Sequence, residues 1–147
     1  MRRGSASRSR FCRAVSIAAR CRASNKGTGL GEFLQRLEGE IRTQKSLVED
    51  LIGRLGGRES RLKQGAAWIA EKLGRFKLND SLLKYSHLSR LLELQALEAA
   101  AQERIAMWET LGLVLRHDAR ARQVSFETLR ERSQNLLTEL SQHRRTE

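Results

Sequence analysis

An unbroken heptad pattern in the first half of the chain constrains its fold more than any other feature. From residue 30 to residue 55, apolar side chains recur at alternating steps of four and three residues, with one polar exception. Only an α-helix brings such positions onto one face, and a heptad face must pack against other helices. The pattern therefore predicts a long helix over residues 30–55. Its seam positions are Leu30, Leu34, Leu37, Ile41, Gln44, Val48, Leu51 and Leu55.

Gln44 is the polar member of this seam. A buried amide among apolar neighbours can set the register or the choice of partner of a helix pair, at some cost in stability. The competing interpretation places Gln44 at the edge of the seam, where its amide reaches water. The sequence leaves both interpretations open.

Three more segments of the chain carry an apolar stripe with helical spacing. The glycine pair at residues 56–57 ends the first helix, and so short a connection returns the chain as an antiparallel αα-hairpin. Ser125 has the position of an N-cap, so we expect the last helix to begin immediately after it. The sequence thus predicts an all-α fold, a four-helix up-down-up-down antiparallel bundle. Its predicted helices span residues 30–55, 59–76, 88–116 and 126–143.

The composition agrees with a helical protein. Proline is absent, aromatic residues make up 5% of the chain, and Leu, Ala, Glu, Arg and Gln are abundant. These abundant residue types favour helix. No apolar run approaches the length of about 18 residues that a membrane span needs, so we expect no insertion into a membrane.

Residues 1–29 differ from the rest of the chain in charge. They hold eight Lys or Arg residues and no acid, whereas the remaining residues hold 20 basic and 17 acidic ones. We predict a disordered, basic, Arg/Ser-rich tail over this segment. Three interpretations are open: an organellar transit peptide, an arm that binds phosphate groups non-specifically, or an extension without a selected role. The predicted location is the cytoplasm, or an organelle if the tail is a transit peptide.

No sequence motif points to catalysis. The chain has no nucleophile elbow, phosphate-binding loop or dinucleotide fingerprint, so we expect neither an enzyme nor a cofactor. Gly27, Gly29 and Gly31 superficially imitate a nucleotide-binding motif. Because no strand precedes these glycines, a flexible hinge explains them better.

A four-helix bundle raises the question of a ferritin-like metal site, in which Glu-x-x-His motifs face inward. The residues three positions before the histidines are Lys84, Val114 and Leu140, so the motif is absent. Cys12 and Cys21 lack the spacing of metal ligands, and we expect both to be reduced thiols. A ferritin-like metal-binding bundle is therefore only a minor alternative.

Trp68 lies outside the apolar stripe of the second predicted helix, on a face with Arg61, Lys72 and Arg75. A tryptophan among cations can bind an acidic partner protein or stack on a base. These four residues are the candidate partner contacts. The competing interpretation packs Trp68 against the following connection or against the last helix of the bundle.

The sequence therefore predicts a non-catalytic helical bundle that serves protein–protein interaction or self-assembly. Long apolar stripes and a polar residue in a coiled-coil-like seam suit the docking of helix on helix. The alternative function is sequence-independent binding of nucleic acid through the basic tail. Such binding is electrostatic and would weaken steeply as salt is added.

Overall fold

The computed structural model describes the backbone of residues 5–55 and 86–146, and the side chains of residues 11–55 and 86–146. Within these ranges the regular structure is entirely helical, which confirms the predicted all-α class. None of the described helices is long and apolar enough to cross a lipid bilayer. The elements are α1 (Ser5–Ser24), α2 (Gly29–Arg54), α4 (His87–Val114), the short 3-10 turn η1 (Ala119–Ala121) and α5 (Phe126–Thr146).

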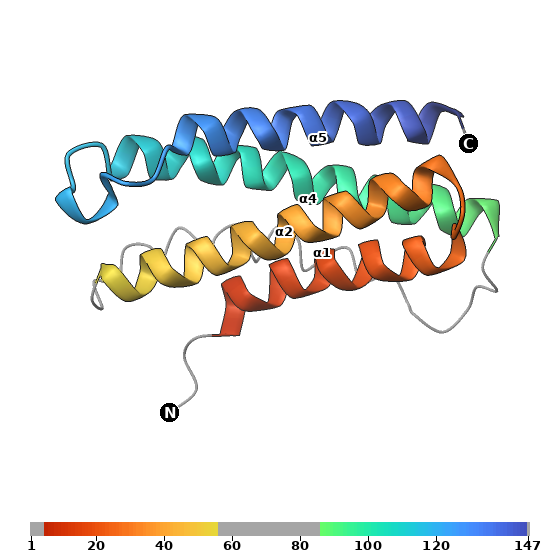
Figure 1. The fold of residues 1–147 in the computed structure, drawn as a ribbon, viewed down its shortest axis with the longest axis horizontal. Coiled ribbons are helices and arrows are strands. Elements are labelled where there is room, and N and C mark those ends of the chain that lie inside the picture. The colour runs from red at the N-terminus through yellow and green to blue at the C-terminus, as the bar shows by residue number, and fades with distance from the viewer. Residues whose placement is uncertain (1–4, 56–85, 147) are drawn as a thin grey trace.

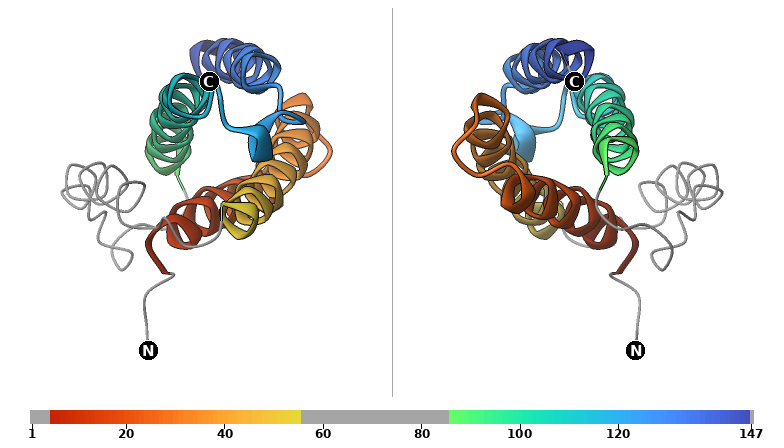
Figure 2. Two further views of the ribbon diagram at one scale, coloured as in Figure 1. Left: turned by 90° about the vertical axis from the view of Figure 1, so that its left-hand side faces the viewer. Right: turned by 90° about the vertical axis from the view of Figure 1, so that its right-hand side faces the viewer.

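The four α-helices of the described ranges form one bundle (Figure 1). Viewed from either end, α1, α2, α5 and α4 follow one another around its axis (Figure 2). The colours of Figure 1 show that α1 and α5 run in one direction and α2 and α4 in the other. Each helix is therefore antiparallel to both of its neighbours. Amphipathic helices arranged in this way turn their apolar stripes toward a shared core.

Three of the described helices correspond to helices predicted from the apolar stripes. The segment 30–55 is α2, the segment 88–116 is α4 and the segment 126–143 is α5, and no end differs by more than three residues. All eight seam positions of α2 are buried. The helix predicted over residues 59–76, with the hairpin it would form, lies outside the described residues.

The N-terminal segment differs from its prediction, because Ser5–Ser24 is helix α1 rather than part of a disordered tail. This helix packs beside α2 and also contacts α4. Its buried residues recur at helical spacing, but most of them are small. Alanine and cysteine add little apolar area, and arginines occupy the other faces, so the stripe is faint in the sequence. Among residues 11–24, whose side chains the structure describes, the buried residues of α1 are Phe11, Ala14, Val15, Ala18 and Cys21.

A defined turn joins α1 to α2 where the sequence suggested a flexible hinge. Asn25 is buried, and its Nδ2 donates to the carbonyl oxygen of Cys21 at 2.7 Å. Thr28 is the N-cap of α2, because its Oγ1 accepts from the backbone N–H of Gly31 at 3.1 Å. The same hydroxyl donates to the carbonyl oxygen of Asn25 at 2.7 Å. Gly27 has a φ of 77°, a conformation that glycine adopts without strain.

A compact connection joins α4 to α5 and lies across one end of the bundle (Figure 2). Its η1 turn contacts α2, and Arg120 Nη1 donates to the carbonyl oxygen of Leu55 at 3.1 Å. Ala121 of the same turn is buried. Ser125 occupies the predicted N-cap position of α5, where its Oγ accepts from the backbone N–H of Thr128 at 3.4 Å. The connection therefore ties α4 and α5 to the end of α2.

Candidate functional site

The four candidate partner contacts named from the sequence lie outside the described residues. All four belong to residues 56–85, so their role stays a prediction: Trp68, Arg61, Lys72 and Arg75. The fifth residue singled out, Gln44, is described. The described ranges also contain two candidate binding sites. One is a set of polar side chains inside the bundle, and the other is an exposed apolar surface at one end of α4.

The structure places Gln44 in the core and not at the edge of the seam, with only 1% of its surface exposed. Its Nε2 donates to Ser133 Oγ of α5 at 3.3 Å and to Glu40 Oε1, one turn earlier in α2, at 3.2 Å. Ser133 is fully buried and donates in turn to the carbonyl oxygen of Leu129 at 2.9 Å. The amide of Gln44 thus connects α2 to α5 through a buried hydrogen bond.

Arg104 of α4 is a buried cation that sequence reasoning missed, with 6% of its surface exposed. Its apolar neighbour Ile105 is only partly buried. Burial lowers the pKa of Arg104 to about 10, against the opposing effect of the carboxylates of Glu40 and Glu103. The guanidinium therefore stays charged at neutral pH. An arginine in an amphipathic helix is normally assigned to solvent, so no sequence signal marked this position.

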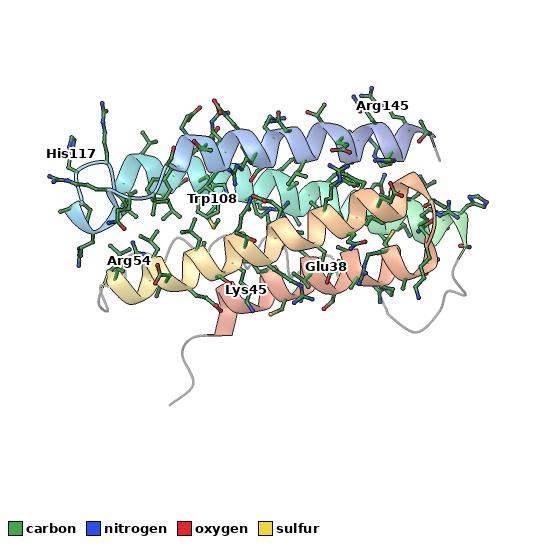
Figure 3. All side chains as sticks on the ribbon, in the orientation of Figure 1. Glu38, Lys45, Arg54, Trp108, His117 and Arg145 are labelled. Atoms are coloured by element: carbon green, nitrogen blue, oxygen red, sulfur yellow. The ribbon has the colours of Figure 1, made fainter. Side chains whose placement is uncertain are left out.

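One edge of the Arg104 guanidinium has no hydrogen-bond partner among the described residues, since Nε and Nη2 are both buried and nothing there accepts from them. Trp108, one turn later in α4, is fully buried, and its Nε1 also has no acceptor in the described ranges. The indole packs against Phe126 of α5, with ring centroids 6.3 Å apart and an angle of 34° between the planes. Figure 3 marks Trp108 in the interior of the bundle. We call Gln44, Arg104, Trp108 and Ser133 the interior polar group.

Two successive apolar side chains face solvent at the C-terminal end of α4. Leu113 is 76% exposed and Val114 is 66% exposed. Ile52, an apolar residue near the C-terminal end of α2, is 40% exposed. The C-terminal ends of α2 and α4 lie at the same end of the molecule (Figure 1). Adjacent exposed apolar residues are more informative than scattered ones, because contiguous apolar patches mark binding sites.

Basic side chains follow this apolar pair in the sequence and are exposed. Asp118, the first acidic residue after Arg116 and His117, is already paired with Arg120, with 2.7 Å between its Oδ2 and Arg120 Nη2. Figure 3 shows His117 at the tip of the connection between α4 and α5. The surface therefore combines apolar and cationic character. We call it the α4 end surface, and it consists of Leu113, Val114, Arg116, His117 and Arg122.

Helix α1 directs two of its arginines into ion pairs with the rest of the bundle. Arg20 Nε lies 2.7 Å from Glu93 Oε1 of α4, and Arg22 Nε lies 3.2 Å from Glu38 Oε2 of α2. The side chains of both carboxylates are mostly buried, with 12% and 10% of their surfaces exposed. These two cations of the N-terminal segment therefore add ion pairs to the packing of α1 on the bundle.

Among the described histidines and cysteines, His143 and Cys21 have packing positions. His143 of α5 stacks on the buried ring of Phe33, with 5.0 Å between the ring centroids. Cys12 is an exposed free thiol and Cys21 a buried one. Within the described ranges, no three His, Cys, Asp or Glu side chains are grouped so that they could hold a metal ion.

The chain matches no protein family, no curated protein and no solved structure. The function is therefore argued from the chemistry of the described residues. The α4 end surface offers apolar and cationic contacts to a large partner, whereas the interior polar group is buried.

Proposed function

We propose that this protein is a non-catalytic helical bundle that binds another protein through the α4 end surface. The exposure of Leu113 and Val114 carries this proposal. Complete burial of such a side chain against a partner stabilises by roughly 1.5–3 kcal/mol, so two neighbours provide a useful anchor. An apolar centre with a polar rim is also the usual composition of a protein-binding surface.

The cations of the α4 end surface favour an acidic partner. Arg116, His117 and Arg122 follow the apolar pair in the sequence and are exposed, and complementary charge would orient the partner and raise the rate of association. A symmetric dimer would bring the same surface of two copies together. Because that contact opposes like charges, we favour a different protein over self-assembly.

Nucleic-acid binding through the N-terminal segment has less support. Arg20 and Arg22, two of the eight Lys and Arg residues of this segment, are engaged by Glu93 and Glu38, so phosphate groups would have to displace a carboxylate at each of these two. A protein partner needs no such exchange. The proposal places the protein in the cytoplasm, because two free cysteines suit a reducing compartment.

The test compares the wild-type chain with the double variant Leu113→Glu/Val114→Glu. A matched control carries Gln102→Glu and Ala106→Glu, at two exposed positions of the same helix. We expect the wild type and the control to capture the same partner protein from a lysate. The double variant should fail to capture it. Calorimetry with that purified partner should show at least a tenfold loss of affinity in the double variant, about 1.4 kcal/mol.

Equal affinity of all three proteins for every captured partner would overturn the α4 end surface as a binding site. Light scattering on the full chain separates the two kinds of association. A dimer that the wild type and the control form and the double variant does not would make the partner a second copy of this chain. A monomer at all concentrations leaves the acidic partner as the occupant.

A further inference from the structure

Arg104 and Trp108 of α4 together hold three buried N–H donors that have no acceptor among the described residues. Two are Nε and Nη2 of Arg104, and the third is Nε1 of Trp108. Residues four apart in a helix lie one above the other on the same face. The two side chains are 6% and 0% exposed, so this face is turned into the bundle. Donors from adjacent turns of one buried face can meet at a single acceptor group.

A buried guanidinium requires a negative partner, because removing a charge from water is costly unless an anion pairs with it. Glu40 and Glu103 attract Arg104 electrostatically, but neither accepts a hydrogen bond from Nε or Nη2. Glu40 Oε1 accepts instead from Gln44 Nε2 at 3.2 Å. Two carboxylates thus attract Arg104, but no described residue accepts a hydrogen bond from its Nε and Nη2.

The unpaired atoms define the shape of the group that fits them. Nε and Nη2 form the side edge of a guanidinium, and their two parallel N–H bonds match the two oxygens of a carboxylate. The indole of Trp108 adds one donor and no acceptor. Three donors and a positive charge select an anion with planar oxygens. The dense packing of a bundle core restricts it to a small one.

We propose that Arg104 and Trp108 bind a small carboxylate ion inside the bundle. Nε and Nη2 of Arg104 donate to its two oxygens, and Nε1 of Trp108 donates to one of them. The bound anion neutralises the buried cation, so occupancy of this site stabilises the folded bundle. The site does not depend on the α4 end surface, because it uses buried atoms only.

Trp108 reports on its own site by fluorescence. The chain has two tryptophans, so the variant Trp68→Phe leaves Trp108 as the only one. We titrate this protein with sodium acetate at constant ionic strength, with sodium fluoride as the balancing salt. The expected result is a saturable change in Trp108 emission and a Tm that rises with acetate concentration above the dissociation constant. Absence of a saturable change would overturn the proposal.

The variant Arg104→Met removes the charge and the donors but retains an apolar stem. Its matched control is Arg132→Met, which removes an exposed arginine of α5. We expect at least a tenfold weaker response to acetate in Arg104→Met and an unchanged response in Arg132→Met. An unchanged titration in Arg104→Met would contradict the assignment. Circular dichroism checks that Arg104→Met is folded. If Arg104→Met unfolds, Arg104→Lys replaces it, because lysine keeps the charge and loses the two-donor edge.

Chloride and phosphate, titrated in the same way, test the shape of the site. A carboxylate site responds to acetate at concentrations at least tenfold lower than to chloride. Equal responses to acetate and chloride would overturn the argument from the paired N–H donors, and a preference for phosphate would overturn the assignment to a carboxylate.

Discussion

Helices α1 and α2 form one hairpin but contribute very different side chains to the same core. The seam of α2 consists mainly of leucine and isoleucine, whereas α1 buries Ala14, Ala18 and Cys21 beside Phe11 and Val15. Apolar area removed from water stabilises in proportion to its size, so α2 has the stronger drive to pack. The comparison shows that a helix with little apolar area can join a bundle when its neighbours supply the large side chains.

Deletion of residues 1–24 should have the largest effect on this comparison, because it removes α1 and uncovers the face of α2 beneath it. Burial of Phe11 and Val15 alone contributes roughly 3–6 kcal/mol, a large part of the stability of an ordinary domain. We expect the urea midpoint, followed by circular dichroism, to fall sharply. Deletion of residues 1–4, which precede α1, is the control. An unchanged midpoint without residues 1–24 would show that α1 adds nothing to the core.

Gly31→Ala should have the next largest effect, because it attacks the turn between the two helices. A Cβ at residue 31 would lie 2.1 Å from the carbonyl oxygen of Asn25, so the backbone must move. We expect a loss of about 3 kcal/mol in the free energy of unfolding, at the upper end for such overpacking. Gly39→Ala is the control, since its Cβ meets nothing within 4 Å and should stabilise α2 by up to about 1 kcal/mol. Similar effects of the two substitutions would contradict the close approach at Asn25.

Ala18→Leu tests whether α1 needs its small side chains. Ala18 is fully buried, so a larger residue must push α1 away from its neighbours at a cost of about 2 kcal/mol. The control is Ala23→Leu at an exposed position of the same helix, where we expect little change. Thermal or urea unfolding of both variants measures the difference. Equal stability of the two would mean that α1 lies more loosely on the bundle than the structure shows.

Arg22→Gln should have the smallest effect. Arg22 pairs with Glu38 of α2, but Arg42 donates to the same carboxylate at 2.8 Å and would keep it paired. Exposed arginines in such pairs contribute about 1 kcal/mol or less. We therefore expect a change in unfolding free energy within that limit, diminishing as salt is added. A loss as large as that of Ala18→Leu would give charge, and not packing, the main role in holding α1.

Sequence patterns predicted the helices in which large apolar residues recur. The seam of α2 and the N-cap Ser125 before α5 are local signals, and both describe the structure correctly. Ile52 shows what such signals leave undecided, because this apolar residue lies beside the seam, where α2 approaches its end, and no neighbour covers it fully. Leu113 and Val114 are exposed for the same reason at the end of α4.

The interior polar group was predicted only in part. Gln44 interrupts a regular seam, so the sequence marked it, although its two interpretations could not be separated without knowing what faces it. Arg104 carried no mark at all, because an arginine is expected in water. Its burial depends on the positions of α2 and α5, which lie far from it in the sequence.

By itself, the sequence determined that this protein is helical and which faces of α2, α4 and α5 turn inward, because helix periodicity is a property of neighbouring residues. Only the tertiary structure decided that Ser5–Ser24 is part of the bundle, that Arg104 is buried and that Leu113 is exposed. A side chain is buried when other segments cover it. Which segments do so depends on the helices that meet in space and not on the spacing of residues along one helix.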